Sequence, residues 1–333
     1  MDTMNPRSLV PPLRAWLDGA TMAAPLPTGV SEIAGRHRLN GTLYHIGARL
    51  SEPDAAKARE SWAQNVANHL ARAAGLKALW AHNGPPPLVF KGADLAENLY
   101  DDPGARACCD LDVLLPQPHY AAAIERLPAD VRMRPPPRGE RFRDEMPFAV
   151  GVEVDDVLIE IHREPQPPHR ASLRAHALYE RGQAGRLGDL DVLYPEPTDR
   201  LLLWLTNQAK ESFYGDLASL VDLALILRNL VGPDLAKHAS ALRAGAADVG
   251  LGNAFDLAVL RLGESALWPG TLPSITRPTV HVVNALLPRV FAPLKHPPTA
   301  RFQAIKTWLC TPAARARLVA RAIATLARGE RPG

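Results

Sequence analysis

Two aspartates separated by one residue, Asp110 and Asp112, open the apolar run Leu111–Leu115. Side chains two positions apart on a strand project from the same face, so both carboxylates would point the same way. Such carboxylates repel each other unless a cation lies between them. Magnesium prefers oxygen ligands and takes further ligands from substrate phosphates, so it suits the pair. The pair predicts a divalent-metal site. In the alternative interpretation, Asp110 is a turn residue and Asp112 a solvated strand end.

A lysine and a glycine follow another short apolar run earlier in the chain. Lys91 and Gly92 come directly after Leu88–Phe90, and a helical composition begins there. A strand that changes into a helix presents main-chain amide hydrogens, and with the lysine charge it suits phosphate binding. Arg106 adds a second positive charge near the aspartate strand. The alternatives are an exposed strand end, a tight turn and a surface arginine.

An acidic residue and a histidine alternate with isoleucines in a third apolar run. In Leu158–His162, Glu160 and His162 share one face of the expected strand. If this strand lies beside the aspartate strand, Glu160 completes a three-carboxylate site. His162 has two open interpretations, a hydrogen-bonded structural histidine or a residue with a direct role in the chemistry.

Hydrophobic spacing and turn residues predict the elements that position these side chains. Helices are expected at residues 52–80, 93–100 and 118–127. Strands are expected at residues 88–90, 111–115, 148–154 and 157–162. Asp155 and Asp156 predict a two-residue hairpin turn between the last two strands. The proline-rich residues 134–139 are expected to form a loop.

The character of the sequence changes after Pro195. Alanine- and leucine-rich stretches with interleaved arginine favour helices at residues 201–205, 217–230, 255–262 and 313–326. We therefore expect an N-terminal helical region at residues 1–84, an α/β core at 85–195 and a C-terminal helical region at 196–333. The fold class is α+β, a mixed sheet with flanking helices.

Composition limits the class of protein. The chain of 333 residues is 47% hydrophobic, enough for a substantial core, and its 38 basic and 35 acidic residues leave a net charge of only +3. That balance alone does not argue for nucleic acid as a partner. The three cysteines fit neither a disulfide framework nor a zinc spacing, so we expect a cytoplasmic protein. The sequence contains no run of about 18 apolar residues, so no membrane span is expected.

Two further groups of residues have a functional and a plain interpretation. An arginine row on the expected last helix suits RNA or an acidic partner, but the modest net charge favours a solvated helix face. This row consists of Arg315, Arg317, Arg321 and Arg328. Three tryptophans in apolar helical surroundings, Trp204, Trp268 and Trp308, are predicted to belong to the core and not to stack on bases.

The order of these motifs resembles a known family. The pattern runs from an apolar-Lys-Gly element through an arginine and an Asp-x-Asp strand to an acidic-x-His strand and a helical region. It is similar to the bacterial uncharacterised nucleotidyltransferase family of the polymerase-beta-like superfamily, over roughly residues 36–262. This chain has Lys91-Gly92 where the superfamily often has Gly-Ser. It has residues 207–210, Asn-Gln-Ala-Lys, where family members commonly show a histidine.

The resemblance implies a function and roles for the site residues. Asp110 and Asp112 would bind one or two Mg²⁺ or Mn²⁺ ions that bridge the triphosphate, and Glu160 would bind the metal facing the acceptor. Lys91 and Arg106 would lie near phosphate oxygens. The implied reaction is transfer of a nucleoside monophosphate from a nucleoside triphosphate, such as ATP, to a hydroxyl of a small molecule, peptide, protein or RNA.

Two other functions are compatible with the same residues. One is a catalytically silent nucleotide-binding or interaction module with the same fold, and the other is a helical scaffold in which Asp-x-Asp is accidental. The presence of all three carboxylates favours the enzyme, because a decayed site tends to lose them first.

Overall fold

The computed structural model describes most of the chain. The described residues are 6–20, 24–80, 84–117, 119–128, 131–134, 149–166, 171–211, 213, 216–287, 305, 308 and 309. The helix expected at residues 313–326 and the arginine row lie outside them, as do residues 135–139 of the expected loop.

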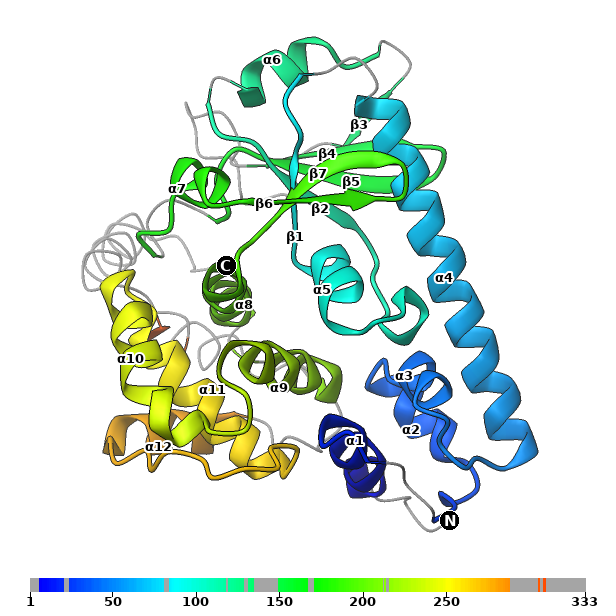
Figure 1. Ribbon diagram of the computed structural model, residues 1–333, viewed down its shortest axis with the longest axis vertical. Helices are drawn as coiled ribbons and strands as arrows, with labels where there is room; N and C mark the ends of the chain where they lie inside the picture. Colours follow the sequence, from blue (N-terminus) through cyan, green and yellow to red (C-terminus); the bar gives the residue numbers. More distant parts are fainter. Residues whose placement is uncertain are drawn as a thin grey trace, which may run out of the picture.

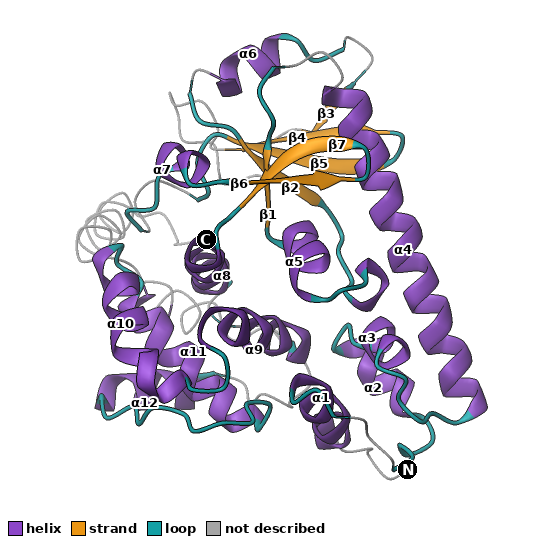
Figure 2. Ribbon diagram, viewed as in Figure 1, coloured by secondary structure: helices purple, strands orange, loops and turns teal. Residues whose placement is uncertain are grey.

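One mixed sheet of seven strands fills the upper half of the molecule (Figure 2). The strands are β1 (Leu88–Phe90), β2 (Leu111–Leu114), β3 (Arg132–Arg134), β4 (Ala149–Val154), β5 (Val157–His162), β6 (Gln183–Leu187) and β7 (Leu190–Tyr194). Their order is β3-β4-β5-β2-β1-β7-β6. At the centre, β2 runs parallel to β5 and antiparallel to β1, and β1 runs parallel to β7. The predicted mixed sheet with flanking helices is confirmed.

Helices surround this sheet and extend below it (Figure 1). They are the 3-10 helices η1 (Pro6–Leu9) and η2 (Pro103–Ala105), with the α-helices α1 (Val10–Leu17), α2 (Val30–Arg36), α3 (Asn40–His45), α4 (Glu52–Trp80), α5 (Gly92–Leu99), α6 (His119–Glu125), α7 (Ala175–Glu180), α8 (Pro197–Lys210), α9 (Leu217–Val231), α10 (Leu235–Asp248), α11 (Gly252–Ser265) and α12 (Pro278–Leu286). None of the described helices is long and apolar enough to cross a membrane.

The two faces of the sheet bury different partners. On one face, Val113 and Ile161 pack in a cluster with Leu76 of the long helix α4 and with residues of α6. On the other, Phe90 and Leu114 belong to a larger cluster that includes buried side chains of α5, α8 and α9. Because side chains alternate along a strand, the polar residues of β2 and β5 belong to this second face.

Two hairpins of the sheet have tight two-residue turns, β4–β5 and β6–β7, and only the first was predicted. Asp155 and Asp156 form the β4–β5 turn with φ of 48° and 62°, as a two-residue hairpin requires. The β6–β7 hairpin was not predicted, although its turn contains Gly188 with φ of 57° next to Asp189. The Gly-Asp pair is a recognised hairpin signal.

The terminal helical regions share one core. Leu13 of α1 and Leu43 of α3 lie in the same hydrophobic cluster as Leu227 of α9. Trp204 and Trp268 are buried there, as predicted. The predicted boundaries at residues 84 and 195 stay a prediction, and the larger cluster extends across both.

Candidate active site

The register of two parallel strands brings an aspartate, a glutamate and a histidine together. Asp112 of β2 pairs with Glu160 of β5, and Leu114 pairs with His162, so Asp112, Glu160 and His162 share one face of the sheet. One ligand atom from each of the three lies within 4.8 Å of the other two. Two carboxylates so close together can hold a divalent cation, and the imidazole nitrogen can be a further ligand only when it carries no proton.

The histidine ring is buried between the two carboxylates and an aromatic side chain. Nε2 of His162 lies 2.8 Å from Oδ1 of Asp112 and 3.3 Å from Oε2 of Glu160. Ionised carboxylates only accept hydrogen bonds, so Nε2 carries the proton and donates it. The ring meets Phe90 edge-on at 5.1 Å between centroids. These contacts orient both carboxylates, as histidines beside metal ligands do.

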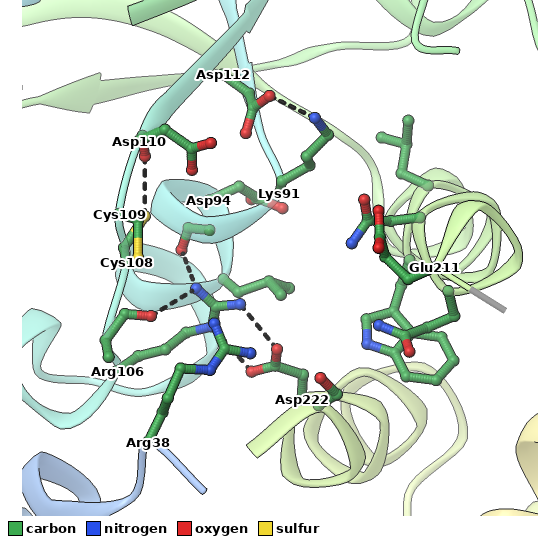
Figure 3. Close-up of a pocket in the computed structure, with 18 of the residues that line it drawn as sticks. Arg38, Lys91, Asp94, Arg106, Cys108, Cys109, Asp110, Asp112, Glu211 and Asp222 are labelled. Carbon is green, nitrogen blue, oxygen red and sulfur yellow. Dashed lines mark hydrogen bonds and ion pairs between the residues drawn. The ribbon is translucent and has the colours of Figure 1, made fainter. Parts of the chain in front are cut away.

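Lys91 occupies a strained position where β1 ends and α5 begins. Its φ of 57° and ψ of −125° lie in a region that non-glycine residues rarely adopt, at a cost of about 1–3 kcal/mol. The turn directs its ammonium to an ion pair with Asp112, shown in Figure 3. The ammonium also lies 5.0 Å from the centre of the Phe90 ring. An internal cation therefore already neutralises the most buried carboxylate of the site.

Gly92 opens α5 at a point where no side chain fits. A Cβ there would lie 2.4 Å from Sγ of Cys108 and 3.1 Å from Nη1 of Arg106. Gly92 lines the same cavity as the carboxylates, so the start of α5 lies at the cavity wall. The first amide groups of α5 have no partners within the helix, and with the helix dipole they favour an anion such as phosphate.

The charged groups of the site shift one another's pKa values. Burial alone would raise the pKa of Asp112, but the Lys91 charge and the hydrogen bond from His162 lower it well below its ordinary value. The hydrogen bond from His162 outweighs burial and lowers the pKa of Glu160. Burial would lower the pKa of Lys91, yet Asp112 raises it overall. At neutral pH, Asp112 and Glu160 are anions and Lys91 is a cation.

Asp110 lines the same cavity but is not one of the three residues within 4.8 Å. Burial, with the neighbouring charge of Asp112, raises the pKa of Asp110. The structure thus brings together two of the predicted carboxylates and the histidine. The predicted set of Asp110, Asp112 and Glu160 as metal ligands stays a prediction.

Arg106 also lines the cavity, where other protein groups engage its guanidinium. Nε and Nη2 donate to the two carboxylate oxygens of Asp222 in α9 at 2.9 and 2.8 Å, and Nη1 donates to the carbonyl of Gly92 at 3.0 Å. Tyr100 donates to the same carboxylate at 2.7 Å. Arg106 thereby ties the start of α5 to α9, and its expected place beside phosphate stays a prediction.

These residues line one cavity of about 440 Å³ between the sheet and helices α8 and α9 (Figure 3). Seven carboxylates and five cationic side chains line it, an excess of two negative charges. Such a surface repels a triphosphate until a cation is added.

Sequence reasoning missed several charged residues of the cavity wall. They form two further ion pairs, Arg38 with Asp216 and Arg200 with Asp94, and Arg200 donates to both Asp94 oxygens at 2.8 and 2.7 Å. The partners are 178 and 106 positions apart in the chain, so no local pattern links them.

A family model described as uncharacterised nucleotidyltransferase matches residues 28–263. This match spans the cavity, the central strands, helices α2 to α10 and most of α11. No curated protein matches the chain, and no solved structure does.

Proposed function

The chain belongs to the uncharacterised nucleotidyltransferase family, and from this membership we propose that it transfers a nucleoside monophosphate from a nucleoside triphosphate to a hydroxyl acceptor with the help of a divalent metal. The observation that carries the proposal is the convergence of Asp112, Glu160 and His162 within 4.8 Å. Lys91 and the start of α5 lie beside this group and suit the phosphates.

The donor atoms fit a hard divalent cation. Asp112 and Glu160 supply carboxylate oxygens, and Asp110 adds a third carboxylate to the cavity wall, a set that suits Mg²⁺ or Mn²⁺. When bound, the metal would offset negative charge on the phosphates and on the departing pyrophosphate. His162 keeps both carboxylates oriented through Nε2.

The side chains at one end of the site bind the triphosphate, and those at the other end face the acceptor. Lys91 and the first amides of α5 bind the triphosphate, because they present positive charge at the cavity wall. The Glu160 side chain is 35% exposed against 3% for Asp112, so Glu160 is the more accessible to an incoming hydroxyl. Glu160 accepts a hydrogen bond from that hydroxyl and orients its oxygen. As the hydroxyl proton passes to the Glu160 carboxylate, a bond forms between this oxygen and the α-phosphorus. The bond from the α-phosphorus to the pyrophosphate oxygen breaks, and pyrophosphate leaves with that electron pair.

One observation favours a second function. The Lys91 ammonium already neutralises Asp112, as expected if a protein cation has taken the place of a metal in a silent nucleotide-binding module. The presence of Asp110 and Glu160 beside the pair favours the enzyme.

Activity measurements on two charge-removing variants test the proposal. The protein is incubated with Mg²⁺, each labelled nucleoside triphosphate and fractionated acceptors, and pyrophosphate release and label transfer are followed. Asp112→Asn should weaken triphosphate binding and turnover together. Glu160→Gln should leave binding largely intact and lower turnover by about a hundredfold or more, because each 1.4 kcal/mol of lost transition-state stabilisation is about tenfold in rate.

Asp191→Asn is the matched control, since Asp191 is an exposed strand aspartate on β7 outside the cavity. It should retain full activity. Unchanged turnover in both site variants contradicts the mechanism. Triphosphate binding without transfer to any acceptor favours the silent module.

A further inference from the structure

Helix α8 presents a polar face to the cavity. Four residues spaced by three, four and seven positions lie on one side of this helix and its C-cap, and all four line the cavity. They are Trp204, Asn207, Gln208 and Glu211. In Figure 3, Glu211 lies across the cavity from Asp110 and Asp112. The proposed phosphate contacts leave this face unused.

Two carboxamides on this face have no partner. Gln208 is only 6% exposed, and its side-chain amide makes no hydrogen bond to any residue that the structure describes. The side chain of Asn207 is partly buried and is also without a hydrogen bond among the described residues. No amide atom of Asn207 or Gln208 is among the described side-chain atoms that are both buried and without a partner, so both carboxamides reach the cavity and can bond to a ligand there. By contrast, Arg106 and Arg200 of the same cavity are fully engaged by carboxylates.

The chemistry of this face suits a flat heterocycle. A carboxamide places a hydrogen-bond acceptor beside a donor in one plane, and this arrangement matches the edge of a nucleobase. The Trp204 side chain, which is 6% exposed and packs edge-on against Phe213 at 6.2 Å, adds an apolar part to the same wall. A phosphate group or a simple hydroxyl needs neither feature.

We propose that Gln208, assisted by Asn207 and Trp204, binds the base of the nucleoside triphosphate and sets the preference for one base over the others. The inference rests on the proposed function, since the carboxylates and Lys91 hold the phosphate end of the same ligand. One cavity of about 440 Å³ contains both walls, a size within the usual range for a small-molecule site.

Binding of nucleotides and of a ligand without a base tests the proposal. Calorimetric titrations with Mg²⁺ compare ATP, CTP, GTP and UTP with inorganic tripolyphosphate. The wild type should bind one nucleoside triphosphate more tightly than the others and more tightly than tripolyphosphate.

Gln208→Met keeps the length of the side chain and removes its amide. It should weaken binding of the preferred nucleotide by about 5- to 100-fold, the usual discrimination of a two-bond base contact, and leave tripolyphosphate binding unchanged.

Thr206→Val is the matched control on the same helix. Thr206 is 5% exposed, its hydroxyl has no partner among the described residues, and it does not line the cavity. Its substitution should change neither titration. Unaltered nucleotide affinity and preference in Gln208→Met, or equal affinity of the wild type for tripolyphosphate and every nucleotide, overturns the base site and leaves the phosphate site intact. If neither ligand class binds the wild type, the proposed function fails and the base site fails with it.

Discussion

Lys91 combines a strained backbone with a largely buried charge, and each of these would be unfavourable by itself. Its backbone is strained, and its charge lies against Asp112, which is 3% exposed. The two are connected, because the strained turn directs the ammonium towards the carboxylate. Since a metal would bind the same carboxylate, the ammonium and the metal compete for it. Lys91 and His162 both contact Oδ1 of Asp112, so a metal on the other oxygen would compete with Lys91 for the carboxylate charge without displacing it, and more of the ammonium charge would then be available to phosphate.

Replacing Lys91 tests this competition. Lys91→Met leaves Asp112 buried without its cation, so we expect a loss of about 3–5 kcal/mol of unfolding free energy in the absence of metal. Lys91→Gly should lose less, because glycine relieves about 1–3 kcal/mol of backbone strain at this turn. Both variants should gain more stability from Mg²⁺ alone than the wild type does. Urea unfolding with and without Mg²⁺ measures these differences, and an equal Mg²⁺ response in all three proteins contradicts the competition.

At the scale of elements, one aspartate joins two helices of the N-terminal region. Asp54, in the first turn of α4, accepts hydrogen bonds from the amides of Gly29 and Ser31 at 2.7 and 3.1 Å. It also accepts from the hydroxyls of Ser31 and Ser51. The carboxylate thus caps the start of α2 from outside that helix. Burial would raise the pKa of Asp54, but the four hydrogen bonds lower it overall.

This cap predicts a pH-dependent stability difference. A lowered pKa in the folded state stabilises the protein above the unfolded aspartate value of about 3.9, and the contribution disappears as the pH falls through the folded pKa. Asp54→Asn should therefore cost about 1.5–3 kcal/mol at pH 7, because hydrogen bonds to a charged acceptor are lost. The difference between variant and wild type should shrink below pH 4. Chemical denaturation at pH 7, 5 and 3.5 measures it, and a deficit that is constant with pH would show that the charge of Asp54 does not matter.

Local elements could be predicted from the sequence, and non-local ones could not. Residues 52–80 were predicted as a helix from apolar spacing, and α4 has the same bounds. The Asp155-Asp156 turn was predicted because two adjacent turn residues separate two apolar runs. The β6–β7 hairpin was missed although it carried a local Gly-Asp signal. The unusual φ of Lys91 had no signal at all, because lysine seldom adopts it.

In the candidate site, too, the local features could be predicted from the sequence and the non-local ones could not. Alternation along one strand was enough to place Glu160 and His162 on a common face. The pairing of Arg106 with Asp222 joins residues 116 positions apart, and only the packing of α9 against α5 brings them together. The polar face of α8 was noticed in the sequence only as a departure from a family pattern. Its orientation towards the cavity depends on the tertiary fold.

At the scale of the whole molecule, buried ion pairs tie the sheet side of the cavity to the helical side. Asp94 of α5 is 1% exposed and binds Arg200 of α8, which is 6% exposed. Arg106 next to β2 binds Asp222 of α9 in the same manner. A ligand that filled the cavity would touch both sides at once. Its binding should therefore stabilise the entire fold and not only the sheet.

The final prediction follows from these ion pairs between the two sides of the cavity. Mg²⁺ together with a nucleoside triphosphate should raise the melting temperature more than the sum of the shifts with either alone, because an excess of two negative charges lines the cavity and repels the triphosphate until a cation is present. At a hundred times the dissociation constant, the ligand adds about 2.7 kcal/mol of stability. The unfolding transition should stay single, since the clusters on both sides of the cavity unfold together.

Differential scanning calorimetry with Mg²⁺, with triphosphate, with both, and with both plus a chelator measures the effect. Asp112→Asn should abolish the synergy and Asp191→Asn should keep it. Equal shifts with and without Mg²⁺ would place the nucleotide away from these carboxylates, and no shift with any triphosphate would support a scaffold that binds no nucleotide.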